Sequence, residues 1–221
     1  PILSQAFKES KKVYIFDLDG TLLDSLNAWD NIGNKYLKTI NVQGSNDLDE
    51  QVSNMTIEEA AHYMKVHFGL KQNIDEIKEG VCTQIKDQYM YHILLKPGVQ
   101  TFLEKCLKQH IKMYIFTASD LLLAKLALKR LKIDQYFQAI YSCDDYGYTK
   151  NQPESYLHLI DGIGYKINEC IVVEDALYAI QSAKQAGLYV KAIYDKNNDN
   201  DWLKICQIAN QNYISFDEME V

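Results

Sequence analysis

The chain has 221 residues, of which 47% are hydrophobic and 24% charged, and its formal net charge at pH 7 is -7. This acidic balance, without a run rich in Lys or Arg, argues against nucleic acid or an anionic membrane as a partner. No apolar run is long enough to span a bilayer and no signal-peptide core is present, so we expect a cytoplasmic protein. We also expect it to be monomeric or weakly dimeric. Its five cysteines show no CxxC spacing, and we expect them to be small buried hydrophobes.

The first part of the chain predicts one strand followed by helices. Residues 13–16 are apolar or aromatic and predict a buried strand. Between residues 24 and 96 the apolar residues recur at intervals of three and four, which is typical of helices. Thr56 and Glu59 have the spacing of a capping box, and Asn73 can cap the next helix. This segment therefore predicts a small helical bundle, which ends near Pro97-Gly98.

From Val99 onward, predicted helices and strands alternate. The expected strands are 113–119, 139–143, 171–175, 189–195 and 213–216. Such alternation is typical of right-handed βαβ units in a parallel sheet. We therefore predict an α/β fold with a Rossmann-like six-stranded core in the order 3-2-1-4-5-6. Residues 1–23 and 97–221 would form this core, and residues 24–96 an inserted α-helical cap domain.

Two carboxylates follow the first predicted strand directly, in the string Asp17-Leu18-Asp19-Gly20-Thr21. Side chains at i and i+2 lie on the same face of a strand, so Asp17 and Asp19 would emerge together. Like charges held close repel unless a cation or a shared proton relieves them. The alternative interpretation is a strand that ends in an Asp-Gly turn with two solvated acids.

Three later positions lie at or just beyond the ends of predicted strands. Thr117 ends the second strand, Lys150 lies in a loop before a helix, and Glu174-Asp175 end the fourth strand. Ligands bind at the carboxyl edge of an open parallel sheet. Each residue also has an ordinary structural explanation. Thr117 could simply be a good strand former and Lys150 a solvated loop lysine, and Glu174-Asp175 could be acids that favour the start of the following helix. Their common placement favours a shared site, and its carboxylates suit Mg²⁺, which prefers hard oxygen ligands.

In this order, the DLDGT string, Thr117, Lys150 and Glu174-Asp175 resemble the motifs of the haloacid dehalogenase superfamily. Residues 150–195 are similar to its branch of β-phosphoglucomutase and small sugar-phosphate phosphatases. The resemblance implies a Mg²⁺-dependent phosphatase in which Asp17 forms an aspartyl phosphate and Asp19 is the general acid and base. It also implies phosphate binding by Thr117, Ala118, Ser119 and Lys150, and metal binding by Asp17, Asp19 (through its carbonyl), Glu174 and Asp175.

The chain departs from that branch at three places. Ala176 and Ala179 replace a common Ser and Gly after the Glu-Asp pair, and Asn151 follows Lys150 where Pro is usual. These changes leave every charged role filled but bear on the fine positioning of Asp175.

The helical insertion resembles the first cap type of the superfamily, which implies that it closes over the site and selects the substrate. Ser53, Asn54 and Met55, just before the capped helix, are candidates for contacts with the leaving group. An ordinary polar connection is the alternative for this segment. The expected substrate is a small phosphorylated metabolite such as a sugar phosphate.

Other functions are compatible with parts of this pattern. A phosphosugar mutase would need a second phosphate anchor in the cap, for which Arg is best suited. The single arginine, Arg130, lies in the predicted core, although lysines of the insertion could substitute (Lys35, Lys38, Lys65 or Lys78). A phospho-acceptor signalling module would have no use for Asp19 or for a large helical insertion. A catalytically inactive binding protein is disfavoured because no catalytic position is missing.

Overall fold

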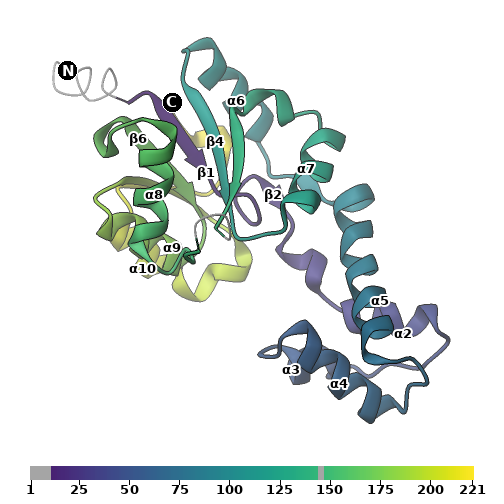
Figure 1. Ribbon diagram of the computed structural model, residues 1–221. Helices are drawn as coiled ribbons and strands as arrows, with labels where there is room; N and C mark the ends of the chain where they lie inside the picture. Colours follow the sequence, from purple (N-terminus) through teal and green to yellow (C-terminus); the bar gives the residue numbers. More distant parts are fainter. Residues whose placement is uncertain (1–10, 144–146) are drawn as a thin grey trace. The chain divides into compact units, whose positions relative to one another are not determined.

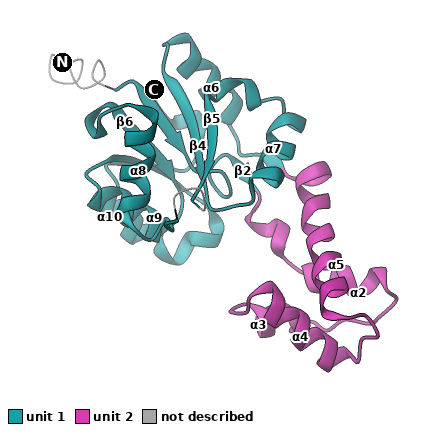
Figure 2. Cartoon of the chain, in the orientation of Figure 1, with its two compact units in different colours: residues 1–24, 94–221 teal, residues 25–93 magenta. Residues whose placement is uncertain are grey.

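The protein is described from a computed structural model in which residues 11–143 and 147–221 are placed. The chain divides into two compact units (Figure 2). Residues 1–24 and 94–221 belong to one unit, and residues 25–93 to the other. The helical unit is thus inserted between two parts of the α/β unit, and its role as a cap stays a prediction.

The α/β unit is built on a six-stranded sheet in the order β5-β4-β1-β6-β7-β8. All the pairs in it are parallel. In terms of the core strands alone this is the order 3-2-1-4-5-6, so the predicted topology is confirmed. The strands are β1 (Val13–Phe16), β4 (Lys112–Thr117), β5 (Ala139–Ser142), β6 (Cys170–Glu174), β7 (Tyr189–Ile193) and β8 (Gln211–Tyr213).

Helices cover both faces of this sheet (Figure 1). On one face lie α6 (Val99–Lys108) and α7 (Leu121–Arg130), and on the other α8 (Pro153–Ile163), α9 (Leu177–Gln185) and α10 (Trp202–Ile208). Successive side chains of β1 point to opposite faces of the sheet, so this one strand packs against the helices on both sides. The rings of Tyr14 and Phe16 meet Phe102 of α6 edge-on, whereas Val13 and Ile15 belong to the core cluster that includes residues of α8, α9 and α10. A strand buried on both faces is apolar throughout, as this one is.

The last strand differs from the sequence-based expectation. We expected it at residues 213–216, but β8 ends at Tyr213. The Ser215 hydroxyl accepts a hydrogen bond from the backbone N–H of Asp217, so the chain turns into the 3₁₀ segment η7 (Phe216–Glu218). A local side-chain cap therefore competes with continued strand pairing. The other 3₁₀ connections of this unit are η3 (Asp134–Tyr136), η5 (Ile167–Glu169) and η6 (Lys196–Asp201).

The helical unit has its own apolar core. Its elements are η1 (Leu26–Trp29), α2 (Ile32–Thr39), α3 (Leu48–Val52), α4 (Ile57–Phe68), α5 (Ile74–Asp87) and the π-helical turn η2 (Gln88–His92). The predicted capping box at Thr56 begins α4, and Asn73 caps α5 as predicted, there too within a capping box. Leu37, Met64 and Ile77 are buried in a cluster to which α2, α4 and α5 all contribute.

A two-stranded antiparallel sheet lies where the chain leaves the α/β unit and returns to it. It pairs β2 (Leu23–Asp24) with β3 (Leu94–Leu95). Next to it, the backbone N–H of Lys96 donates to the carbonyl of Leu22 at 2.9 Å. Sequence analysis did not find these strands, because two residues are too few to show a period of two.

Two expectations about burial need correction. Cys82 is exposed and Cys206 is half-buried, because they occupy outward positions on helices; Cys106, Cys143 and Cys170 are buried as expected. The run from Leu121 to Leu131 is strongly apolar in sequence, which favours a buried helix. It forms α7, but Leu122 of that helix is 60% exposed, since an amphipathic surface helix buries only one stripe. Among the described residues, no helix combines the length and apolarity needed to cross a membrane.

Candidate active site

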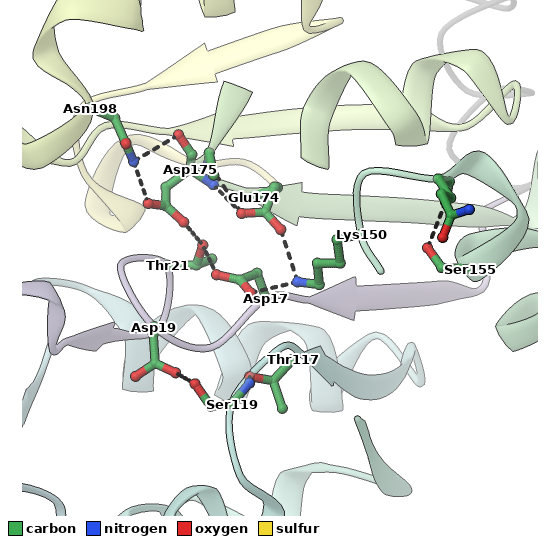
Figure 3. Close-up of polar contacts among 12 residues, drawn as sticks. Asp17, Asp19, Thr21, Thr117, Ser119, Lys150, Ser155, Glu174, Asp175 and Asn198 are labelled. Atoms are coloured by element: carbon green, nitrogen blue, oxygen red, sulfur yellow. Dashed lines mark hydrogen bonds and ion pairs between the residues drawn. The ribbon is translucent and has the colours of Figure 1, made fainter. Parts of the chain in front are cut away.

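The register of the sheet brings Asp17 beside Glu174 and Asp175. Phe16 pairs with Val173 of β6, and the Asp17 N–H then donates to the Val173 carbonyl at 3.0 Å. β1 and β6 therefore end within one residue of the same level, and Asp17, Glu174 and Asp175 emerge together at the carboxyl edge of the sheet (Figure 3). Asp17 is 9% exposed, Glu174 1% and Asp175 2%.

Thr21 connects two of these acids. After Asp19 the chain turns through Gly20 at φ 87°, a left-handed conformation that favours glycine. The Thr21 hydroxyl then lies 3.0 Å from Asp17 Oδ2 and 2.9 Å from Asp175 Oδ1. A hydroxyl has one proton to donate, so both contacts are hydrogen bonds at once only when one of the two carboxyls is itself protonated.

Lys150 supplies the positive charge of the cluster. Its Nζ lies 2.5 Å from Asp17 Oδ1 and 3.0 Å from Glu174 Oε2, and its side chain is 2% exposed. The other oxygen of Glu174 accepts hydrogen bonds from the backbone N–H groups of Asp175 and Ala176. The interpretation of Lys150 as a solvated loop lysine is therefore wrong.

The cluster carries more negative than positive charge. Burial raises the pKa of Asp17, and Glu174 raises it further against the opposing effect of Lys150. Burial also raises the pKa of Asp175, with further contributions from Glu174 and Asp17. For Lys150, burial lowers the pKa, but the charges of Asp17 and Glu174 outweigh burial and hold the pKa well above its ordinary value. Lys150 thus stays charged, whereas a proton or a cation would stabilise the buried carboxyls of Asp17 and Asp175.

The three acids fit a divalent metal ion. One carboxylate oxygen from each of Asp17, Glu174 and Asp175 can be chosen so that all three lie within 4.8 Å of one another. Hard oxygen donors at this spacing suit Mg²⁺, which keeps several waters and tolerates few protein ligands. A dication would also relieve the repulsion that raises the two aspartate pKa values.

The second aspartate of the motif faces β4 instead of this cluster. Asp19 accepts a hydrogen bond from the Ser119 hydroxyl (Figure 3). The N–H of Ser119 donates to Thr117 Oγ1 at 3.0 Å, and Thr117 is buried at the end of β4. Ala118, between them, is exposed. The loop after β4 and the turn after β1 therefore bring the predicted phosphate-binding residues next to the predicted acid and base.

Sequence analysis missed two residues that contact the acids. Thr21 belongs to the quoted motif but was given no role. Asn198, in η6, donates from Nδ2 to Asp175 Oδ2 at 2.6 Å and to the Asp175 carbonyl at 3.2 Å. No sequence signal marks Asn198, because the segment around it is rich in Asn and Asp throughout.

The three candidate specificity residues lie in the helical unit. Ser53, Asn54 and Met55 are exposed between α3 and α4. Within this unit, Ser53 and Met55 line a cavity of about 400 Å³, together with Trp29, Asp30 and Asp49 among others. Their contact with a substrate stays a prediction.

Comparison with known proteins gives a family match over most of the chain. The family model described as haloacid dehalogenase-like hydrolase matches residues 14–193. The phosphorylated carbohydrates phosphatase of Thermotoga maritima is 25% identical over 178 residues, covering 79% of this chain and 81% of the relative. The fructose-1-phosphate phosphatase YqaB of Escherichia coli is 22% identical (79% and 92% covered), and the β-phosphoglucomutase of Bacillus subtilis is 24% identical (82% and 83%).

Solved structures share the fold. A β-phosphoglucomutase candidate from Thermotoga maritima superposes with a TM-score of 0.81 at 22% identity, covering 91% of this chain and 94% of that one. YfnB of Bacillus subtilis, crystallised with bound magnesium, gives 0.74 at 19% identity, covering 94% and 96%. At these identities the likeness establishes the common fold.

Proposed function

Because the chain belongs to the haloacid dehalogenase-like hydrolase family, we propose that it is a Mg²⁺-dependent phosphatase acting on a small phosphorylated sugar or a related monoester. The observation that carries this proposal is the buried cluster of Asp17, Glu174 and Asp175 around Lys150. Three acids held together at the carboxyl edge of the sheet repel one another unless a cation or a proton neutralises them, and such strained groups cluster at functional sites. Mg²⁺ held by these carboxylates would neutralise charge on a phosphate dianion, which lets an anionic nucleophile approach.

Asp17 is the proposed nucleophile. Its carboxylate oxygen forms a bond to phosphorus while the bond from phosphorus to the ester oxygen breaks, which leaves an aspartyl phosphate and the alcohol. Lys150 lies 2.5 Å from Asp17 Oδ1, so its ammonium group is close enough to bind a phosphoryl oxygen during the transfer. Thr117 and the N–H groups of Ala118 and Ser119 are the further proposed donors to the phosphoryl group.

Asp19 is the proposed general acid and base. As an acid it protonates the departing ester oxygen, and as a base it then takes a proton from the water that hydrolyses the aspartyl phosphate. Its hydrogen bond from Ser119 orients the carboxyl toward the loop that would bind phosphate. Asp19 is also more exposed than Asp17, so it has the solvent contact that proton exchange requires.

Sugar phosphates are the favoured substrates because of the relatives' activities, and the helical unit favours hydrolysis over a mutase reaction. Curated relatives are named for phosphorylated carbohydrates, fructose 1-phosphate and validoxylamine A 7'-phosphate. Among the described residues that line the cavity beside Ser53 and Met55, none is Lys or Arg. Such a cavity offers no anchor for a second phosphate, which supports a phosphatase over a mutase that works through a bisphosphate.

The proposal is tested by phosphate release from a panel of sugar phosphates, phosphoglycolate, nucleotides and an aryl phosphate, with Mg²⁺ or with EDTA. We expect turnover that requires Mg²⁺ and falls at least about 10³-fold in Asp17→Asn. The matched control is Asp134→Asn, at an exposed aspartate in η3, which should keep full activity.

Other outcomes separate the alternatives. Isomerised sugar phosphate without release of phosphate would indicate the mutase. A stable phosphoprotein labelled at Asp17 would indicate the signalling module. Binding of sugar phosphates with neither product nor label would indicate an inactive binding protein.

A further inference from the structure

Two side chains hold the carboxylate of Asp175 from different directions. The Thr21 hydroxyl contacts Oδ1 at 2.9 Å, and the Asn198 amide donates to Oδ2 at 2.6 Å (Figure 3). Repulsion from Asp17 and Glu174 favours rotation of this carboxylate away from its neighbours. A polar partner on each oxygen opposes that rotation, because turning the carboxylate plane would break one of these contacts. Ala176, the next residue, has no side-chain donor.

The loop that carries Asn198 is anchored by a buried acid. Asp195 is the N-cap of η6, and its Oδ1 accepts hydrogen bonds from the N–H and the side-chain amide of Asn197 at 2.8 and 2.9 Å. The N–H of Asn198 itself donates to the Asp195 carbonyl at 2.9 Å. One hydrogen bond from Asn198 and two from its neighbour Asn197 therefore tie this loop to Asp195.

Asp195 is in turn paired with Lys96. The Lys96 Nζ lies 2.7 Å from Asp195 Oδ2, with 10% and 4% of the two side chains exposed, and it also donates to the Tyr194 carbonyl. The backbone N–H of Lys96, just after β3, donates to the carbonyl of Leu22, which directly follows Thr21. A charged pair this deeply buried is costly to break from one side, so it holds the start of η6 against the segment that returns from the helical unit.

We propose that Asn198 is a positioning residue of the metal site, held in place by the Lys96–Asp195 ion pair. The Asn198 amide sets the orientation in which Asp175 offers its oxygen to a divalent cation, as residues behind metal ligands commonly do. The inference rests on the proposed function, since it assigns to Asn198 an effect on the affinity of that site for Mg²⁺.

The test measures binding of Mg²⁺ to the full chain by calorimetry, without substrate, and of Mn²⁺ by its electron paramagnetic resonance signal. Asn198→Ala should raise both Kd values about 10–100-fold. Asn200→Ala is the matched control, since Asn200 lies exposed in the same loop, and it should change them less than about twofold. Phosphatase activity of Asn198→Ala should recover substantially at saturating Mg²⁺, because the nucleophile and the acid are intact.

Lys96→Met tests the second part of the inference. It should also raise the Kd for Mg²⁺, and the double variant with Asn198→Ala should bind no more weakly than Asn198→Ala alone, because both changes act through one contact. Additive losses would overturn the link from Lys96 to Asn198.

Each remaining outcome decides a different claim. If Asn198→Ala lowers stability in EDTA but keeps the native Kd, Asn198 is structural and the inference is wrong, while the phosphatase proposal stands. If the unaltered protein binds neither cation, the proposed function fails first and the inference fails with it.

Discussion

Replacement of Lys150 by Met removes the ammonium group that contacts both Asp17 and Glu174. The side chain is 2% exposed, and its two N–O distances are 2.5 and 3.0 Å. A pair of unit charges about 4 Å apart interacts by about 4 kcal/mol at an effective dielectric constant near 20. The Met variant is spared the desolvation of the ammonium group, so the net loss is smaller than the sum of both contacts. We expect the free energy of unfolding in EDTA to fall by roughly 3–5 kcal/mol at neutral pH.

The same variant should respond more strongly to Mg²⁺ than the unaltered protein. Without Lys150 the three carboxylates carry one more uncompensated negative charge, so a dication is attracted more strongly. We expect Mg²⁺ to restore about 1–3 kcal/mol more stability in Lys150→Met than in the parent. Its kcat/KM should nevertheless fall by about 10²–10³, since the variant loses the proposed contact of the ammonium group with the transferring phosphoryl group.

Urea unfolding followed by tryptophan fluorescence is the appropriate assay. The chain has two tryptophans, Trp29 in the helical unit and Trp202 in the α/β unit, so a Trp29→Phe background reports on the α/β unit alone. Lys204→Met, at an exposed lysine of α10, is the matched control and should unfold like the parent. An unchanged midpoint for Lys150→Met in EDTA would refute the charge-balance reasoning. The reasoning would also be refuted if Mg²⁺ raised the free energy of unfolding of Lys150→Met by no more than it raises that of the parent.

Two further predictions concern the same cluster. Thr21→Val keeps the shape of the side chain but removes the hydroxyl between Asp17 and Asp175, so it should weaken Mg²⁺ binding, measured by calorimetry, about tenfold. Thr21→Ser keeps the hydroxyl and should bind Mg²⁺ within about threefold of the parent. Equal affinities of the Val and Ser variants for Mg²⁺ would contradict this role of Thr21. Because burial raises the folded-state pKa of Asp17 and of Asp175 above the ordinary value of 3.8, the metal-free protein holds protons that the unfolded chain releases, and its stability should fall as pH rises from about 4 toward 8. Mg²⁺ should therefore stabilise the protein more at the upper end of that pH range. If the difference between the urea midpoints with Mg²⁺ and with EDTA stays constant over this range, the carboxyls of Asp17 and Asp175 do not titrate as inferred.

The sheet and the positions of the main candidate site residues could be predicted because they follow from local patterns. A short apolar run buried on both faces is recognisable in sequence, and whatever follows it must emerge at the carboxyl edge of a parallel sheet. Asp17, Thr117 and Glu174 are all placed by this rule alone. Lys150 follows no strand directly, and its place in the site came from the resemblance to the superfamily.

Residues whose role depends on tertiary pairing could not be predicted in this way. Lys96 stands beside Pro97-Gly98, where the sequence indicates only the end of a helical segment, yet its side chain forms a buried ion pair with an acid 99 positions later. Asn198 is one of several Asn and Asp residues in η6, and local preference treats it like Asn197 and Asn200. What distinguishes Asn198 is that β6 and β7 are neighbours in the sheet, which brings the loops beyond their ends together. A residue that orients a metal ligand need only reach that ligand in space. Strand order and loop length determine which residue does so, and neither produces a periodic or compositional signal in the sequence.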